Sequence, residues 1–116
     1  MTPDRPQSDK PKIVSEFADD KEFSDLIELF VSELPDRVAA IESAFEAQNH
    51  EEVFRLTHQL KGSGPGYGFP TIGEAAGVVE EWYRERSEPV QAELEDVRKQ
   101  IDDLVDLCQR ATHPTN

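Results

Sequence analysis

The residues of this chain that could do chemistry surround one histidine, His58, in the stretch 56–64. Arg55 stands three residues before it and Lys61 three residues after it, so on a helix both cations can reach a group attached to the imidazole ring. Gly62 stands four residues after His58, where a larger side chain would overhang the ring. Glycine inside a helix costs about 0.5–1 kcal/mol relative to alanine, so its presence here needs an explanation, and space for the approach of another protein is one.

His58 is expected to point away from the core. At about 100° per residue, Val53, Thr57 and Leu60 cluster on one face of a helix, and His58 lies about 140° from Val53. A neutral imidazole is a good nucleophile towards phosphorus, and histidines form covalent phospho-intermediates. A nearby cation such as Lys61 can offset the charge of a phosphoryl group. We therefore predict that His58 is a phosphoacceptor and that Lys61 supports it.

The other polar residues near His58 have more than one interpretation. Gln59 either contacts a partner or the phosphoryl group, or is a solvated helix residue. Arg55 is a second candidate cation, and Lys61 could also be an ordinary solvated charge. Ser63 is expected to pack or to bond to the local backbone and not to take part in chemistry.

Other kinds of site are disfavoured. The glycine-rich stretch 62–68 fits neither G-x-G-x-x-G nor the P-loop spacing, and it follows a helix where those loops follow a strand. His50 and His58 are about 12 Å apart along a helix, too far to share a metal ion. His113 is near the C-terminus, and the single cysteine, Cys108, excludes an internal disulfide. An enzyme would need an acid–base pair or a nucleophile in a cleft. We expect no enzymatic activity and no metal or other cofactor bound to this chain.

Helical periodicity predicts the elements that position His58, and no stretch alternates like a strand. The last series of apolar residues, from Val90 to Cys108, alternates steps of four and three, as in a bundle seam. We predict an all-α fold, an antiparallel up-down-up-down four-helix bundle with an additional N-terminal helix over about 20–34 that caps one end. The four bundle helices are expected from Pro35 to about 48, from 50 to the glycine cluster, from Pro70 to about 86, and from 90 to about 108.

Composition limits the remaining functions. The chain has 116 residues, room for one domain, with 25 acidic and 12 basic residues and a net charge of −13. This balance argues against binding nucleic acid or anionic membranes. No apolar run approaches the roughly 20 residues of a membrane span, and no secretory signal is recognisable. A cytoplasmic monomer is expected, with a flexible leader over 1–12, a domain over 13–110 and a flexible tail over 111–116.

Residues 58–63 resemble the signature of histidine-containing phosphotransfer (HPt) domains, His-x-Leu-Lys-Gly-Ser. In that signature a small residue follows, here Gly64, and a glycine stands five positions after the serine, here Gly68. The resemblance covers roughly 13–110 and implies a four-helix bundle in which the histidine is phosphorylated, the lysine lies beside the phosphoryl group and the following glycine opens access. The chain departs from the family at 64–66, where Gly-Pro-Gly is expected to bend or end the helix.

The resemblance also implies partners. HPt domains are intermediates of multistep two-component phosphorelays, so we expect a response-regulator receiver domain, a hybrid histidine kinase, or both. The chemistry would be supplied by the partner, in a receiver domain by its own aspartate and Mg²⁺. Two alternatives are a histidine-bearing domain excised from a larger histidine kinase and an adaptor that binds receiver domains without being phosphorylated. The start at Met1 and the two tails favour a stand-alone protein.

Overall fold

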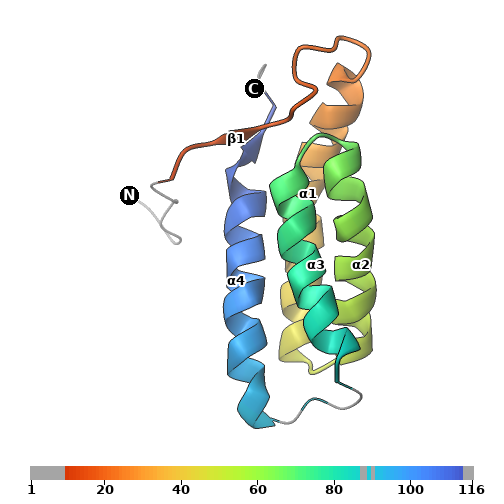
Figure 1. Cartoon of the computed structure of the whole chain (residues 1–116). Helices are drawn as coiled ribbons and strands as arrows, with labels where there is room; N and C mark the ends of the chain where they lie inside the picture. Colours follow the sequence, from red (N-terminus) through yellow and green to blue (C-terminus); the bar gives the residue numbers. More distant parts are fainter. Residues whose placement is uncertain (1–9, 87–88, 90, 114–116) are drawn as a thin grey trace.

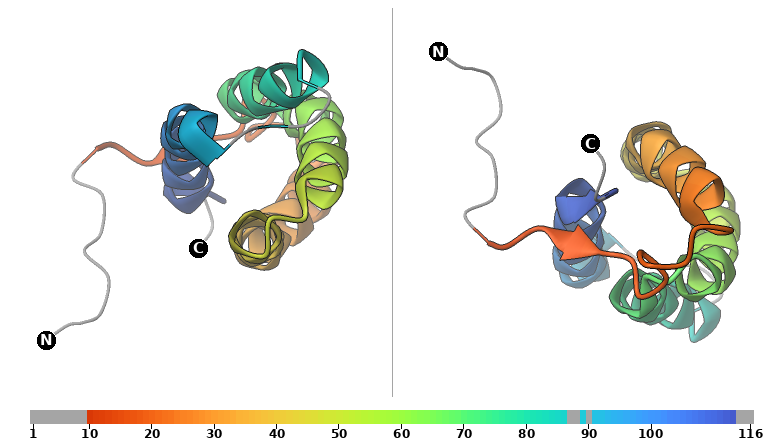
Figure 2. Two further views of the ribbon diagram at one scale, coloured as in Figure 1. Left: turned by 90° about the horizontal axis from the view of Figure 1, so that it is seen from below. Right: turned by 90° about the horizontal axis from the view of Figure 1, so that it is seen from above.

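The computed structural model describes residues 10–86, 89 and 91–113 as an all-α bundle, which confirms the predicted fold class. Successive helices run in opposite directions (Figure 1), and in views along the bundle they follow one another in chain order around a common core (Figure 2). A short 3₁₀ helix, η1 (Gln91–Glu93), leads into the last helix. The four α-helices are α1 (Ser24–Glu46), α2 (His50–Gly66), α3 (Pro70–Arg84) and α4 (Leu94–Arg110).

The core consists of one apolar stripe from each helix, and α2 and α3 form the most extensive helix pair. Burial of a large apolar side chain contributes about 1.5–3 kcal/mol, so these stripes dominate the stability of the bundle. The largest fully buried apolar side chains are Phe69, Ile27, Leu34, Ile41, Leu60, Ile72, Ile101, Leu104, Val53, Val79 and Val97.

Helix α1 corrects the prediction of a separate N-terminal helix over 20–34. Residues 24–46 form one helix that continues through Pro35. A proline inside a helix costs about 3 kcal/mol. The apolar stripe continues beyond it with Val38, Ile41 and Phe45, all buried, and their burial outweighs that cost. The proline is therefore tolerated, because a helix that ended at Pro35 would leave half of the apolar stripe exposed.

The Gly-Pro-Gly triplet at 64–66 forms the last turn of α2, so the helix ends there, in agreement with the expectation that the triplet would bend or end it. A Cβ atom on Gly64 would lie 2.9 Å from the backbone nitrogen of Gly73 in α3. A Cβ atom on Gly73 would lie 2.5 Å from the Pro65 ring and 3.1 Å from the carbonyl oxygen of Lys61. Both glycines are needed because the two helix backbones approach each other too closely for a side chain.

Two short strands, which the periodicity did not predict, join the ends of the described chain. Strand β1 (Ile13–Val14) pairs in parallel with β2 (Ala111–Thr112). His113 is 2% exposed, and its Nε2 lies 3.1 Å from Oγ of Ser24. Residues 111–113 are thus packed against the bundle, which corrects the predicted tail at these positions. The rest of that tail, 114–116, and most of the predicted leader, 1–9, lie outside the described residues.

The segment after β1 covers the end of the bundle where α2 turns into α3. The Ser15 hydroxyl donates to the carbonyl oxygen of Tyr67, and the Glu16 amide donates to that of Gly68. Gly68 has a φ of +90°, a conformation that glycine adopts without strain, so this turn explains the glycine. None of the described helices combines the length and the apolar character that crossing a membrane requires.

Candidate functional site

Helix α2 presents His58 to solvent. The helix begins after Asn49, whose side chain caps the amide of Glu52, and it turns Val53, Thr57 and Leu60 into the core. The Thr57 hydroxyl satisfies its buried position by donating to the carbonyl oxygen of Val53. The His58 side chain is 65% exposed, as the helical projection predicts. His58 is therefore accessible to another macromolecule.

The buried carboxylate of Glu80, on α3, anchors the His58 ring. Nδ1 of His58 lies 2.5 Å from Oε2 of Glu80, whose side chain is 1% exposed. Nη2 of Arg84 lies 2.7 Å from the same oxygen, and Nζ of Lys61 lies 3.2 Å from Oε1. One buried anion thus holds three nitrogen groups, two from α2 and one from its own helix.

The charge state of Glu80 decides which nitrogen of His58 carries the proton. Burial raises the pKa of Glu80, but the hydrogen bond from His58 and the charges of Lys61 and Arg84 outweigh it, so the pKa is lowered overall. The side chain is a carboxylate at neutral pH and can only accept hydrogen bonds. Nδ1 of His58 is therefore the donor of the hydrogen bond to Glu80, and in the neutral ring the lone pair is on Nε2. Among the described residues Nε2 has no hydrogen-bond partner.

Two features of α3 allow this arrangement. The apolar stripe of Ile72, Ala76 and Val79 turns Glu80 inward on the side that faces α2. A Cβ atom on Gly77 would lie 3.5 Å from Cδ of Lys61, so the lysine stem lies directly across this glycine on its way to Glu80. Lys61 belongs to α2, but its side chain is positioned by contacts with Gly77 and Glu80 of α3.

The other candidate residues are Gly62, Gln59 and Arg55, and each has different surroundings. Gly62 is exposed, and a Cβ atom there would meet nothing within 4 Å, so packing does not require the glycine. Gln59 is exposed. Arg55 forms its ion pair with Glu52, at 2.5 Å, and the described contacts do not bring it to His58. That hydrogen bond raises the pKa of Arg55 and lowers that of Glu52.

Phe54 lies beside the His58 ring and Arg84 contacts the same Glu80 oxygen as His58, although neither was a candidate from the sequence. The Phe54 ring lies 6.5 Å from the His58 ring, nearly parallel to it, and the Arg84 guanidinium lies over Phe54 at 5.6 Å. Sequence reasoning missed both residues and Glu80. The signal for Glu80 was its position, four residues after Ala76 and three before Tyr83, where a charged residue interrupts a buried stripe.

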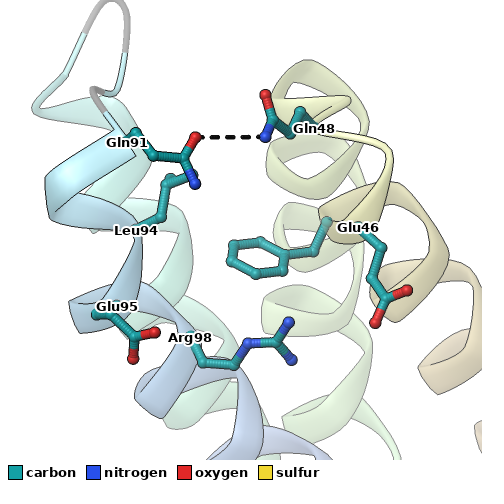
Figure 3. A pocket seen from close by; sticks show the side chains of 7 residues that line it. Glu46, Gln48, Gln91, Leu94, Glu95 and Arg98 are labelled. Carbon is teal, nitrogen blue, oxygen red and sulfur yellow. Dashed lines mark hydrogen bonds between the residues drawn. The ribbon is translucent and has the colours of Figure 1, made fainter.

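One hollow of the bundle does not belong to this site. The one drawn in Figure 3 has a volume of about 450 Å³ and lies between the end of α1 and the start of α4. Gln48 and Gln91 bond across it at 3.3 Å, and Arg98 lies over the Phe45 ring at 4.8 Å. None of its residues comes from α2 or α3. Among the described residues, no His, Cys, Asp and Glu side chains form a group of three that could hold a metal ion.

Comparison with known proteins places the chain in a family. The family model of the Hpt domain matches residues 25–111, which is most of the chain. The chain belongs to the Hpt domain family. A search of curated proteins and a search of solved structures gave no match. Hpt domains carry phosphoryl groups in two-component phosphorelays and are carriers, not catalysts, so this Hpt domain takes part in phosphotransfer with phosphorelay kinases and receiver proteins.

Proposed function

We propose that His58 of this Hpt domain accepts a phosphoryl group and exchanges it with the aspartate of a response-regulator receiver domain. One observation carries the proposal: the ring is exposed, yet its Nδ1 is fixed by a buried carboxylate. An imidazole held in this way presents one nitrogen, Nε2, to a partner. Orientation of a nucleophile before the encounter removes part of the entropic cost of the reaction.

The step needs little from this chain beyond the oriented nucleophile. The Nε2 lone pair attacks phosphorus of the receiver's aspartyl phosphate, the Nε2–P bond forms, and the aspartate leaves as a carboxylate with the electron pair of the P–O bond. In this proposal the receiver binds Mg²⁺ and supplies the metal-ion chemistry, and this chain binds no metal ion. All groups of the site come from α2 and α3 of one chain, so a monomer suffices.

Charge supports the choice of partner. The chain carries a net charge of −13, yet Lys61 and Arg84 lie at His58, each about half exposed. Two half-exposed cations beside the imidazole suit a partner whose reacting group is an anion. A histidine kinase domain that passes the group to His58 would use the same face.

The test is transfer from a receiver domain charged with acetyl phosphate. We expect label in the Hpt domain that is labile to acid and stable to base, as phosphohistidine is. His50→Gln, in the same helix, is the matched control and should label normally. Binding of the receiver without label would favour the adaptor alternative, and label that persists in His58→Gln would refute the assignment. Testing the same chain within a longer kinase would address the excised-domain alternative.

A further inference from the structure

The Glu80 carboxylate is placed to govern the proton of His58 after phosphorylation as well as before it. Resting on the proposed function, we propose that Glu80 keeps a proton on Nδ1 of phosphorylated His58, so that the ring departs as neutral imidazole when the phosphoryl group moves on. Glu80 is then a positioning residue, since it touches the ring but not the phosphoryl group.

The surroundings of Glu80 keep it ionised and directed at the ring. Oε2 accepts from Nδ1 of His58 at 2.5 Å and from Arg84 at 2.7 Å, and Oε1 faces Lys61 at 3.2 Å. Arg84 also lies 3.7 Å from Glu81, an exposed acid of the same helix. Among the described residues, α1 and α4 contribute no salt-bridging group to Glu80. Two cations with persistent charge therefore hold the carboxylate, and the imidazole provides the third contact.

The loading step leaves a positive charge on the ring. Neutral His58 has its proton on Nδ1 and attacks with Nε2, so formation of the N–P bond makes the ring an N-phosphoryl imidazolium. In water this cation loses its proton readily. A carboxylate at hydrogen-bond distance from Nδ1 stabilises the charged form, typically by one pK unit or more. Glu80 does not take the proton itself because Lys61 and Arg84 stabilise its anion.

The retained proton determines how well the group leaves. When an acceptor carboxylate attacks phosphorus, the N–P bond breaks and its electron pair returns to Nε2. If Nδ1 is protonated, the leaving group is neutral imidazole, and no proton has to be delivered during transfer. If Nδ1 has lost its proton, the leaving group is an imidazolate anion, a much poorer one. Glu80 thereby makes phosphorylated His58 a ready donor.

The experiment compares the wild type with Glu80→Gln, which keeps the size of the side chain and removes its charge. Both are loaded with phosphoramidate, a small phosphoryl donor, so that the test does not depend on the receiver. Hydrolysis of the N–P bond is then followed against pH. We expect the profile of Glu80→Gln to shift by about one unit to lower pH, with loss of label about tenfold slower at neutral pH. Glu81→Gln, one residue away on the same helix, should retain the wild-type profile.

A second measurement needs no variant. Nitrogen NMR of the ¹⁵N-histidine-labelled wild type should show the phosphoryl group on Nε2 and a proton on Nδ1 at neutral pH. A deprotonated Nδ1, a phosphoryl group on Nδ1, or identical hydrolysis profiles for wild type and Glu80→Gln would overturn the proposal. Transfer from a charged receiver tests the proposed function separately: its absence, with the expected profile shift, would refute that function and leave the role of Glu80 intact.

Discussion

The interface between α2 and α3 and the interface between α1 and α4, here called the two seams, lie on opposite sides of the bundle (Figure 2). They are built differently. At the first, backbones meet at Gly64 and Gly73, and a buried carboxylate binds groups from both helices. At the second, side chains leave a hollow of about 220 Å³ beside Leu34 and Cys108. Burial raises the pKa of the Cys108 thiol to about 12, so it stays protonated and unreactive.

Under the proposed function, this difference separates stability from chemistry. Helices packed through flexible side chains tolerate small shifts, which is sufficient for a seam that only holds the bundle together. A hydrogen bond between groups on two helices requires their backbones to stay in one register. Glycines at the crossing of α2 and α3 meet that requirement because the contact of backbone with backbone leaves no rotamers to adjust.

The largest expected effect separates the two seams directly. His58→Gln should abolish labelling by a charged receiver while the melting temperature stays nearly unchanged, because the side chain is 65% exposed and the glutamine amide can still donate a hydrogen bond to Glu80. Leu34→Ala, on the other seam, should lower the free energy of unfolding by about 2–5 kcal/mol and leave transfer by the folded fraction normal. Transfer assays and thermal melts on the same preparations measure both. Equal loss of transfer in the two variants would contradict the separation.

Two glycines of α2 should respond in opposite ways to added side chains. At Gly62 there is open space, so Gly62→Gln should leave the isolated domain no less stable, since glutamine is the better helix former by several tenths of a kcal/mol. Transfer from a receiver should still fall sharply, because the new side chain lies one turn from the imidazole.

Gly64→Ala is the matched comparison. Its Cβ atom would lie 2.9 Å from a backbone nitrogen, so we expect a loss of about 1–3 kcal/mol in the free energy of unfolding. Chemical denaturation and transfer rates decide the matter. Reduced stability with normal transfer in Gly62→Gln would show that this glycine serves the backbone and not access.

The buried carboxylate should make stability depend on pH. The pKa of Glu80 is lower in the folded protein than in the unfolded chain, so its stabilising effect is complete above the ordinary pKa of glutamate and is lost as the pH falls through the lowered value. At neutral pH, Glu80→Gln should cost about 1–3 kcal/mol, and the difference from wild type should shrink on acidification. Urea unfolding across this range measures it. A difference that does not change with pH would mean that Glu80 is not ionised in the fold.

The smallest effect is expected for Lys61→Ala. The ammonium is half exposed, so after solvent screening its charge is worth on the order of 1 kcal/mol, a few-fold to tenfold in transfer rate. Single-turnover transfer kinetics would measure this. A loss as complete as that of His58→Gln would reveal a chemical role for Lys61 beyond its charge.

The sequence by itself determined the features that depend on local spacing. Helical periodicity gave an all-α fold, the start of α2 at His50 and the outward direction of His58, because these follow from 3.6 residues per turn. The spacing of His58, Lys61 and Gly62 indicated the Hpt domain family, and the match to the family model confirms it. The same local rules misjudged Pro35, where burial of the apolar stripe beyond the proline outweighed its local preference to end a helix.

Only the tertiary structure decided which charges meet. Glu80 stands 22 residues after His58, and nothing in local spacing states that the two helices bring them to 2.5 Å. Arg55, three residues from His58, pairs with Glu52 instead, while Arg84 reaches the site through Glu80. The physical reason is that a buried carboxylate must find cations wherever the packed helices place them, because leaving it unpaired away from water costs more than any local preference supplies.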